Sequence, residues 1–338
     1  MFQNRMYETS QEARSCPKGD LLIVEDHETG LVFNLKFQPE LVDYDTHYQN
    51  EQAVSPLFQS HLEQVAAVVE AHLGRSKLIE VGCGKAFFLE MLVQNGLDVT
   101  GFDPTYEGGS ARVRKEYFRS GCGLRASGLI LRHVLEHIAD PIGFLKTLAN
   151  ANAGQGKIYI EVPCFDWICE RRAWFDIFYE HVNYFRMKDF ERMFNRIYAA
   201  GRIFGGQYLY VVADLGSLRV PKYDPDDAVA FPQDFSRSLL SVEQSRPEYP
   251  VCVWGGASKG VIFSLLRERT GCPVSTVIDV NPAKQGKYLP GTGLKVESPE
   301  EALKKWPPGA TIYVMNSNYL EEIKKMSGYA YHYIGVDQ

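Results

Sequence analysis

The sequence predicts an α/β protein with two Rossmann-like domains in tandem, preceded by a short N-terminal element. Two stretches support this prediction, because each reads as an apolar strand, a glycine turn, an amphipathic helix and a second strand ending in an acid. The first runs from Leu78 to Asp103, and the second begins at Val251 with V-C-V-W-G-G-A-S-K-G. The length of 338 residues agrees with two or three domains, each able to bury a core.

Composition and charge indicate a folded protein whose partner is a small molecule. Hydrophobic residues make up 45% of the chain and aromatic residues 12%, which excludes a disordered chain. The net charge of −6 gives no electrostatic reason to expect nucleic acid or an anionic membrane. No apolar run reaches the roughly 18 residues of a membrane span, and the first ten residues lack the apolar core of a signal peptide.

Cysteine usage points to a reducing compartment. The seven cysteines are odd in number and form no C-x-x-C pair. Reduced thiols in a cytoplasm are the simplest account of this pattern. We therefore expect a cytoplasmic protein, either a monomer or a homodimer.

The N-terminal part is expected to form a small arm with a hairpin, over residues 1–54. Short apolar runs alternate there with turns, and Glu28 to Gly30 is the expected hairpin turn. Ser55 and Pro56 then begin an apolar stripe with helical spacing, which Gly74 ends.

The rest of the chain divides into three parts. An α/β domain is expected over residues 55–215 and a second, smaller one over residues 250–338. Between them, residues 216–249 are rich in Asp and Pro and read as a connector, with a helix around Phe235 to Val242.

The turn Gly82-Cys83-Gly84 is the first candidate for a cofactor site. Glycines let backbone N–H groups approach a ligand closely, and the helix expected to begin near Lys85 points its positive end at the turn. Asp103 follows about twenty residues later, where a carboxylate accepts the hydroxyl groups of a ribose.

Two classes of cofactor use this arrangement. Dinucleotide sites prefer G-x-G-x-x-G, but Phe87 stands at the third glycine, and Glu80 before the turn would repel a pyrophosphate. The pattern E-x-G-x-G resembles motif I of the class I S-adenosylmethionine-dependent methyltransferases, whose cofactor has no phosphate. NAD binding and an ordinary αβ turn are the alternatives.

Polar residues also follow the strand G-L-I-L-R. His133, directly at the strand's end, is expected to form a wall of the cofactor pocket, with Arg132 and Glu136 at its lip. For His137 and Asp140 a helix cap or a solvated face is the favoured interpretation.

An aromatic insertion, residues 166–185, follows the next strand, which is expected to end at Glu161. Its density of polar and aromatic groups exceeds what a core helix needs, so we expect it to line a cavity. Within it stands His181, whose unperturbed pKa of about 6.5 suits proton abstraction near neutral pH. A buried structural histidine is the alternative interpretation.

Together these motifs resemble the sugar C-methyltransferase family, enzymes that methylate a ring carbon of nucleotide-linked keto-deoxysugars. The resemblance covers about residues 45 to 325 and rests on the strings E-V-G-C-G-K-A, G-F-D-P, V-L-E-H-I-A-D-P, F-Y-E-H-V-N-Y-F, G-G-A-S-K-G, V-I-D-V-N-P-A-K-Q-G-K-Y-L-P-G-T-G-L-K-V and M-N-S-N-Y-L-E-E-I. It implies S-adenosylmethionine as cofactor, and His181, paired with Glu180, as general base. It also implies that Gly255 to Gly260 help to hold the substrate's nucleotide.

The chain departs from that family in two places. The family usually begins with a zinc module of four cysteines, but here only Cys16 precedes Cys83, so we expect no zinc. The family's tyrosine two residues before the Glu is Phe178 here, while Tyr179 replaces an intervening polar residue.

The second glycine turn has its own alternatives. Lys259 beside a helix amino end suits one anionic group of a substrate, such as a nucleotide phosphate. We favour this interpretation over a second cofactor site for NAD, with a purely structural use as the other possibility.

The expected site therefore consists of three groups of residues and no metal. The catalytic group is His181, Glu180 and Tyr179. If His181 removes a proton from a carbon beside a carbonyl, Tyr179 or Tyr184 would donate a hydrogen bond to the resulting enolate oxygen. The cofactor group is Glu80, Gly82, Cys83, Gly84, Asp103, Pro104, His133 and Tyr48. The substrate group is Asn183, Tyr184, Gly255, Ser258 and Lys259. O- or N-methylation, an NAD-dependent oxidoreductase and a non-catalytic binding protein are the alternative functions.

Overall fold

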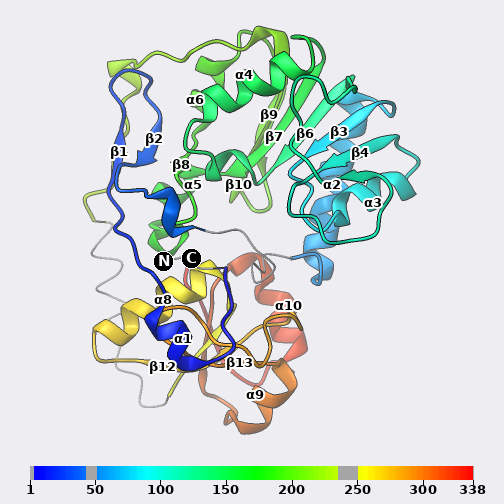
Figure 1. The fold of residues 1–338 in the computed structure, drawn as a ribbon. Coiled ribbons are helices and arrows are strands. Elements are labelled where there is room, and N and C mark those ends of the chain that lie inside the picture. Colours follow the sequence, from blue (N-terminus) through cyan, green and yellow to red (C-terminus); the bar gives the residue numbers. More distant parts are fainter. Residues whose placement is uncertain (1–3, 43–51, 235–249, 338) are drawn as a thin grey trace.

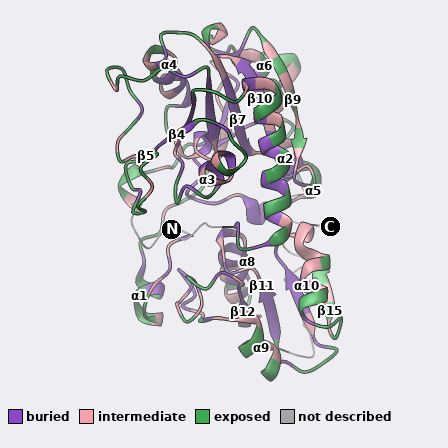
Figure 2. Ribbon diagram, turned by 90° about the vertical axis from the view of Figure 1, so that its right-hand side faces the viewer, coloured by how far each residue is buried: buried purple, intermediate pink, exposed green. Residues whose placement is uncertain are grey.

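The computed structural model describes residues 4–42, 52–234 and 250–337, which form two α/β domains and an N-terminal segment that contacts both (Figure 1). Figure 2 shows that the strands of both large sheets are mostly buried, whereas the helices expose one side. The connector helix expected at 235–242 lies outside the described residues.

The first domain is built on a seven-stranded sheet with the order β5-β4-β3-β6-β7-β10-β9. Strands β3 to β7 of this sheet are parallel, and β10 is antiparallel to both of its neighbours. The strands are β3 (Leu78–Val81), β4 (Val99–Phe102), β5 (Val113–Arg114), β6 (Gly128–Arg132), β7 (Lys157–Pro163), β9 (Ile197–Ile203) and β10 (Tyr208–Asp214). The strand expected to end at Glu161 continues to Pro163.

Helices cover both faces of this sheet. Alternate residues of the central strands enter different apolar clusters, with Leu78 on one face and Ile79 on the other. The cluster that contains Leu78 also contains side chains of α2 (Pro56–Leu73) and α3 (Phe87–Gln94). The cluster that contains Ile79 also contains side chains of α4 (Pro141–Ala151) and α6 (Met187–Met193). The carboxyl ends of the parallel strands are therefore the open edge at which a ligand can bind.

The bounds of α2 confirm the helix predicted from local signals. The Ser55 side chain accepts a hydrogen bond from the Phe58 backbone N–H, and Pro56 occupies the first turn. Gly74, at φ +84°, ends the helix in a conformation that favours glycine.

The N-terminal segment forms the expected hairpin and reaches both domains. Strands β1 (Ile23–Glu25) and β2 (Val32–Asn34) pair antiparallel, and β2 pairs with β8 (Asn183–Tyr184) of the first domain. The short helix α1 (Ser10–Ser15) lies beside the C-terminal domain, where Arg14 pairs with Glu268.

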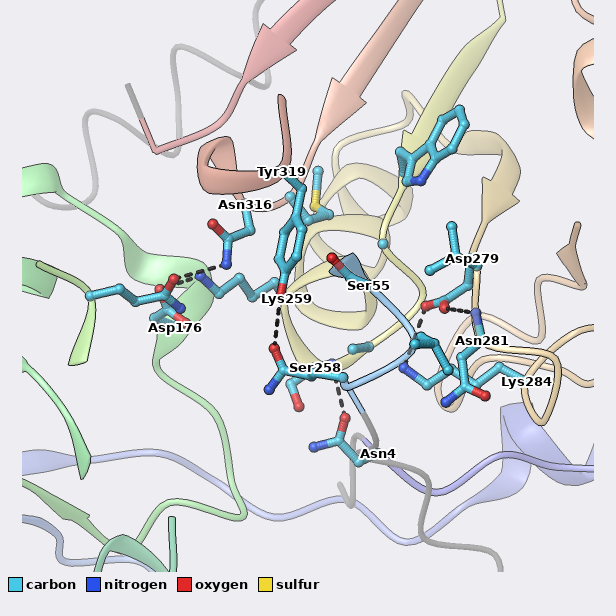
Figure 3. A pocket seen from close by; sticks show the side chains of 18 of the residues that line it. Asn4, Ser55, Asp176, Ser258, Lys259, Asp279, Asn281, Lys284, Asn316 and Tyr319 are labelled. Atoms are coloured by element: carbon cyan, nitrogen blue, oxygen red, sulfur yellow. Dashed lines mark hydrogen bonds and ion pairs between the residues drawn. The ribbon is translucent and has the colours of Figure 1, made fainter. Parts of the chain in front are cut away.

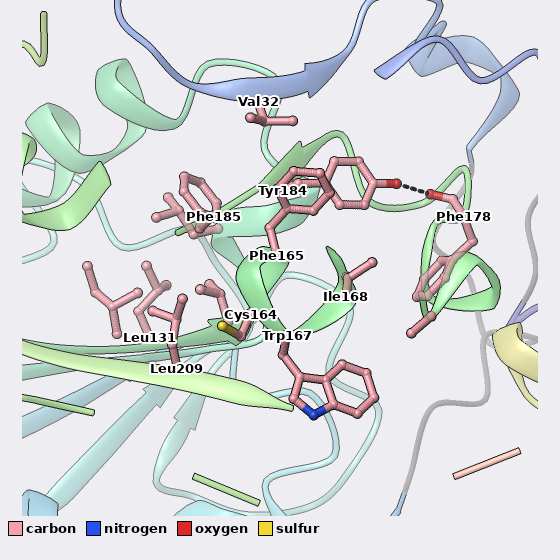
Figure 4. Packing of buried hydrophobic residues seen from close by; sticks show 14 of the residues in the cluster. Val32, Leu131, Cys164, Phe165, Trp167, Ile168, Phe178, Tyr184, Phe185 and Leu209 are labelled. Carbon is pink, nitrogen blue, oxygen red and sulfur yellow. Dashed lines mark hydrogen bonds between the residues drawn. The ribbon is translucent and has the colours of Figure 1, made fainter. Parts of the chain in front are cut away.

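The aromatic insertion supplies much of the core beside β7. It contains α5 (Phe165–Arg171) and a 3-10 turn, η3 (Trp174–Asp176). Figure 4 shows its aromatic side chains stacked between the sheet and β2. Most of the insertion is therefore core, and only part of it borders a cavity.

The C-terminal domain is a smaller Rossmann-like unit, as the sequence predicts. Its five strands are all parallel, in the order β13-β12-β11-β14-β15. The elements are β11 (Val251–Trp254), α8 (Ser258–Arg269), β12 (Val274–Ile278), β13 (Val296–Glu297), α9 (Pro299–Lys305), β14 (Thr311–Val314), α10 (Leu320–Met326) and β15 (His332–Gly335). Within the described residues, the structure contains no helix with the length and apolar character needed to cross a membrane.

Candidate active site

A cavity of about 670 Å³ opens at the carboxyl ends of β3, β4 and β6. We name it the cofactor cavity, and its size falls within the roughly 300 to 1,000 Å³ usual for small-molecule sites. The structure brings together at this cavity the expected cofactor residues that it describes, namely Glu80, Gly82, Cys83, Gly84, Asp103, Pro104 and His133. Tyr48, also expected there, lies outside the described residues.

The two glycines of the first turn have different roles. Gly82 has φ +74°, and a Cβ added to it would lie 2.5 Å from a methyl carbon of Val134. Gly84 has φ +52°, and a Cβ there would meet no heavy atom within 4 Å. Gly82 is therefore required by packing and backbone conformation, whereas Gly84 leaves the backbone open toward the cavity.

Asp103 holds the turn in place. One carboxylate oxygen accepts the Gly84 N–H at 2.8 Å, and the other accepts the backbone N–H and the hydroxyl of Thr105, both at 2.8 Å. These three bonds leave lone pairs on a carboxylate, which offers about four acceptor positions. Asp103 thus joins β4 to the glycine turn and still presents an acceptor to a ligand.

Glu80 is a buried acid with one unpartnered oxygen. Its Oε2 has no hydrogen-bond partner among the described residues. Burial raises the pKa of Glu80 to about 8, with nearby Asp103 adding to the rise and Arg132 opposing it. A cationic ligand group beside Glu80 would favour the carboxylate, whereas a pyrophosphate would favour the protonated acid.

Behind the cavity, Glu161 organises a buried polar network. Its carboxylate contacts His61 at 3.0 Å, His133 at 3.0 Å, Arg132 at 3.3 Å and the Tyr159 hydroxyl at 2.7 Å. Burial alone would raise the pKa of Glu161, but Arg132 and the two histidines hold it well below its ordinary value. The network therefore contains a permanent negative charge.

His133 is a fixed cation in the cavity wall. Its Nε2 contacts Glu161 at 3.0 Å and its Nδ1 contacts Glu136 at 3.3 Å. Burial lowers the pKa of His133, but these two carboxylates outweigh burial and raise it to about 9. The imidazolium form therefore dominates at neutral pH, with both N–H groups directed at carboxylates.

A second cavity of about 200 Å³ lies between the two domains. We name it the acceptor cavity; Figure 3 shows residues of the N-terminal segment, the insertion and the C-terminal domain around it. Gln52, His133 and His137 line both cavities, so the two spaces adjoin. Residues of distant segments, among them Gln207, Tyr208, Asn316 and Tyr319, complete its wall.

His181 lies in the wall of the acceptor cavity and is 8% exposed. Its ring centroid is 3.9 Å from that of Phe178 and 4.9 Å from that of His137. Burial holds the pKa of His181 well below its ordinary value, and electrostatic repulsion from His137, His133 and Lys259 lowers it further. Its imidazole is therefore neutral at physiological pH, the form that can accept a proton.

Glu180 anchors the loop that contains His181. Its fully buried carboxylate accepts the Asn4 backbone N–H at 2.6 Å and the Asn4 side-chain amide at 2.8 Å. Its backbone carbonyl accepts a hydrogen bond from His137 Nδ1 at 2.8 Å. Glu180 thus connects the N-terminal segment to His137 and positions the wall of the cavity.

Tyr179 points away from both cavities. Its hydroxyl accepts the Gln38 backbone N–H at 2.9 Å and donates to the Lys36 carbonyl at 3.4 Å. Burial raises its pKa. The structure does not bring Tyr179 to either cavity, contrary to its expected place in the catalytic group, and its side chain instead joins the hairpin to the insertion.

Tyr184 and Asn183 also support the loop. The Tyr184 hydroxyl donates to the Phe178 carbonyl at 3.2 Å (Figure 4), and the Asn183 amide donates to the Ile138 carbonyl at 2.6 Å. Neither residue is among those that line the two cavities. Their strand, β8, pairs with β2, so the expected substrate contacts are replaced by contacts that fix the loop.

His137 was expected on a cap or a solvated face, but it lines both cavities. Donor atoms of Glu136, His137 and His181 all lie within 4.8 Å of one another, a spacing that a metal ion could bridge. The V-L-E-H string after β6 was the available signal, since residues after a parallel strand reach the open edge of the sheet. Asp140, by contrast, caps α4 as expected, accepting the Gly143 N–H at 2.8 Å.

The C-terminal unit contributes Gly255, Ser258 and Lys259 to the acceptor cavity, as expected. The Lys259 ammonium, however, lies 2.9 Å from an Asp176 carboxylate oxygen, 5.5 Å from the ring centre of Trp167 and 5.7 Å from that of Phe175. The Lys259 ammonium thus forms an ion pair with an acid of the first domain.

Family models match both domains. Residues 47–197 match a methyltransferase domain, and residues 227–334 match a C-methyltransferase C-terminal domain. The chain is an S-adenosylmethionine-dependent methyltransferase. Its first domain has the class I methyltransferase fold, which confirms the fold predicted from the first glycine turn.

Solved structures similar to the methyltransferase have low identity. The methyltransferase domain of bacterial CtHen1 is 17% identical, with 47% of this chain and 99% of that chain covered and a TM-score of 0.37. A SAM-dependent methyltransferase from Archaeoglobus fulgidus is 15% identical, with 47% and 99% covered and a TM-score of 0.33. The Burkholderia thailandensis 1,6-didemethyltoxoflavin N1-methyltransferase is 14% identical, with 58% and 98% covered and a TM-score of 0.34. No curated protein matches the sequence significantly.

The residues of the cofactor cavity fit S-adenosylmethionine. The Gly84 backbone is open to a ligand, the Asp103 carboxylate suits ribose hydroxyls, and the unpartnered oxygen of Glu80 suits a cationic group. The cofactor cavity therefore has residues that suit S-adenosylmethionine, and a second cavity adjoins it.

Proposed function

We propose that the methyltransferase adds a methyl group to a carbon beside a carbonyl group of a small molecule, with His181 as general base. The observation that supports this proposal is the position of His181 in the wall of the acceptor cavity, which adjoins the cofactor cavity through shared lining residues. When bound, S-adenosylmethionine supplies the electrophilic methyl group. The match of residues 227–334 to a C-methyltransferase domain also favours carbon as the acceptor atom.

The reaction begins when His181 removes a proton from the carbon beside the carbonyl. The resulting enolate has its negative charge on oxygen, where a preorganised donor lowers the barrier. Tyr208 is suited to donate this bond, because it lines the acceptor cavity and burial raises its pKa, which keeps the hydroxyl protonated. Tyr208 also contacts His133, with ring centroids 4.5 Å apart.

Burial contributes to this chemistry. The Phe178 ring packs against the His181 ring in a tilted arrangement, and the other walls of the cavity come from both domains. Excluding water protects an enolate from being quenched, and holding reacting atoms about 3 to 3.5 Å apart lowers the entropic part of the barrier.

A keto-deoxysugar has a carbon of the required kind. The sequence strings that resemble sugar C-methyltransferases and the C-methyltransferase C-terminal domain both support such a sugar as the acceptor. O- or N-methylation of another metabolite is the alternative, because the same cofactor cavity would serve it.

Hydrogen exchange tests the proposal. With S-adenosylhomocysteine bound, the enzyme should exchange the acidic C–H of an accepted keto-sugar for deuterium from D₂O, because proton removal needs no methyl donor. A panel of free and nucleotide-linked 3-keto- and 4-keto-deoxysugars, observed by NMR, identifies the accepted compound. A chelator in parallel reactions distinguishes a histidine base from a metal ion bound near Glu136, His137 and His181.

We expect His181→Ala to lose exchange and methylation by at least a hundredfold while S-adenosylhomocysteine affinity is retained. His332→Ala is the matched control, because His332 is exposed on β15. A His181→Ala enzyme that methylates within about threefold of the parent would make this residue structural. A product methylated on oxygen or nitrogen would contradict enolate chemistry.

A further inference from the structure

Two loops place a carboxylate and two imidazoles together in the wall of the acceptor cavity. Glu136 and His137 belong to a 3-10 turn, η2 (Leu135–His137), that follows β6, and His181 lies in the aromatic insertion. Donor atoms of the three side chains lie within 4.8 Å of one another. Two histidines and one carboxylate form a common ligand set of zinc sites that keep a fourth position open.

Backbone contacts fix the two loops relative to each other. The Val182 N–H donates to the Glu136 carbonyl at 2.8 Å, and His137 Nδ1 donates to the Glu180 carbonyl at 2.8 Å. The second bond assigns the proton of a neutral His137 ring to Nδ1 and the lone pair to Nε2. A histidine that binds metal through one nitrogen is commonly supported in this manner through the other.

Both imidazoles of this cluster favour the form that binds metal. Burial lowers the pKa of His137, and it holds the pKa of His181 well below its ordinary value. A neutral imidazole presents a lone pair, so a metal ion does not have to displace a proton near pH 7. The two rings are neighbours, with centroids 4.9 Å apart.

The carboxylate of Glu136 is the third donor. The residue is 1% exposed, and its Oε1 contacts His133 Nδ1 at 3.3 Å. Its Oε2 has no hydrogen-bond partner within the part of the chain that the structure describes. A buried carboxylate oxygen without a partner is unfavourable, and a bound cation would satisfy it.

Three cations near the cluster weaken its attraction for a metal ion. The His133 imidazolium and the Arg132 guanidinium share the carboxylate of Glu161, at 3.0 and 3.3 Å. The Lys259 ammonium lies 2.9 Å from an oxygen of Asp176. These two acids and the carboxylate of the cluster equal the three cations in number. We therefore expect micromolar affinity rather than the much tighter binding of a structural zinc site.

We propose that Glu136, His137 and His181 bind a divalent transition metal ion such as zinc, and that the bound ion inhibits methylation by occupying the lone pair of His181. Tetrahedral zinc holds its donor atoms roughly 3.4 Å apart, so the two loops have to approach each other by about an ångström. The site itself does not depend on the proposed function. Its inhibitory effect does, because the proposed function makes His181 the base.

A binding measurement tests the site without requiring turnover. Zinc chloride is titrated by calorimetry into the full-length enzyme after treatment with a chelator and removal of that chelator. We expect one ion per chain with a Kd of about 1 to 50 μM. Cobalt(II) is the second probe, because its absorption spectrum distinguishes nitrogen and oxygen ligands from the thiolates of the free cysteines.

His137→Asn tests the ligand set. Asparagine can still donate to the Glu180 carbonyl but has no counterpart of Nε2, so we expect zinc affinity to fall at least tenfold. His332→Ala is the matched control, because His332 is exposed on β15, and it should bind zinc as the parent does. If His137→Asn does not fold, Glu136→Gln replaces it, since glutamine keeps the shape and removes the charge.

Hydrogen exchange on an accepted keto-sugar tests the inhibition. Zinc at ten times its Kd should slow the exchange of the parent roughly tenfold, and an excess of EDTA should restore it. Zinc bound at this site with full exchange would overturn the inhibition and also contradict His181 as the base.

Two results would overturn the site itself. One is a parent enzyme that binds zinc more weakly than about 100 μM. The other is a folded His137→Asn or Glu136→Gln variant with the affinity of the parent. A parent that exchanges no ketone, with or without EDTA, would contradict the proposed function and leave the binding result standing, so the two failures are distinguishable.

Discussion

The two strand–glycine–helix units have nearly the same local construction. In each, an aspartate after the second strand accepts a glycine N–H of the turn at 2.8 Å and the N–H two residues further along the chain at 2.8 Å. Asp103 does this in the first unit and Asp279 in the second. The hydrogen-bond pattern of the turn alone therefore does not distinguish a cofactor site from another kind of ligand wall.

The units differ in what the rest of the chain places beside the turn. In the first, Gly84 faces open space, and Glu80 keeps an unpartnered oxygen within the described structure. In the second, Asn4 accepts the Ser258 N–H and Asp176 pairs with Lys259. The same strand–glycine–helix pattern therefore borders the cofactor cavity in the first unit, where the turn faces open space. In the second unit, where remote residues contact the turn, it forms one wall of the acceptor cavity.

The largest effect is expected from Lys259→Met, which breaks the ion pair of the second unit. Asp176 would be left buried without its cation, which should lower the free energy of unfolding by about 2 to 3 kcal/mol. This loss of unfolding free energy is smaller than for a fully buried ion pair, because both side chains remain partly exposed to solvent. Affinity for S-adenosylhomocysteine should be unchanged. Thermal and chemical denaturation measure the stability, and calorimetry measures the affinity.

Lys304→Met is the control for this change. Lys304 pairs with Glu300 on α9, but both side chains are exposed to solvent, so its removal should leave the free energy of unfolding nearly unchanged. If the two variants are destabilised equally, the Lys259–Asp176 pair contributes no more to stability than the exposed Lys304–Glu300 pair, which would contradict our account.

A smaller effect, on the pH dependence of cofactor affinity, should come from the titration of Glu80. The pKa of about 8 keeps most of this side chain protonated at pH 6.5 in the free enzyme. A cationic ligand group favours the carboxylate, so binding releases a proton and affinity rises as the pH increases toward 8. The gain is at most about tenfold per pH unit.

Glu80→Gln isolates this effect, because glutamine has nearly the same shape and does not titrate. S-adenosylhomocysteine affinity of the parent and the variant is compared from pH 6.5 to 8.5 by calorimetry. Parallel pH profiles would mean that Glu80 does not face the cationic part of the ligand. A steeper rise for the parent is the result that our account requires.

Much of the fold follows from local signals. Ser55 and Gly74 bound α2, the turn near Glu28 to Gly30 joins β1 and β2, and both glycine turns lie between a strand and a helix. Caps and turns act through residues a few positions apart, so the sequence displays them directly. The residues lining the cofactor cavity were predictable for the same reason.

The acceptor cavity depends on contacts that local sequence does not display. Asn4 meets Glu180 across 176 positions of the chain, and Asp176 meets Lys259 from another domain. Tyr179 and Tyr184 are close to His181 in sequence, yet the Tyr179 hydroxyl binds the backbone of Gln38 and the Tyr184 hydroxyl binds the backbone of Phe178. Proximity in sequence does not fix the direction of a side chain in an irregular loop, so the sequence did not show that these two hydroxyls bind backbone groups.

The most direct test of the central claim compares the two aspartates by calorimetry with S-adenosylhomocysteine. We predict one binding site per chain, an affinity loss of roughly ten- to a hundredfold for Asp103→Ala, and an unchanged affinity for Asp279→Ala, because only the first unit holds the cofactor. Two sites per chain, or equal losses in the two variants, would contradict the assignment of one unit to the cofactor and the other to the acceptor cavity.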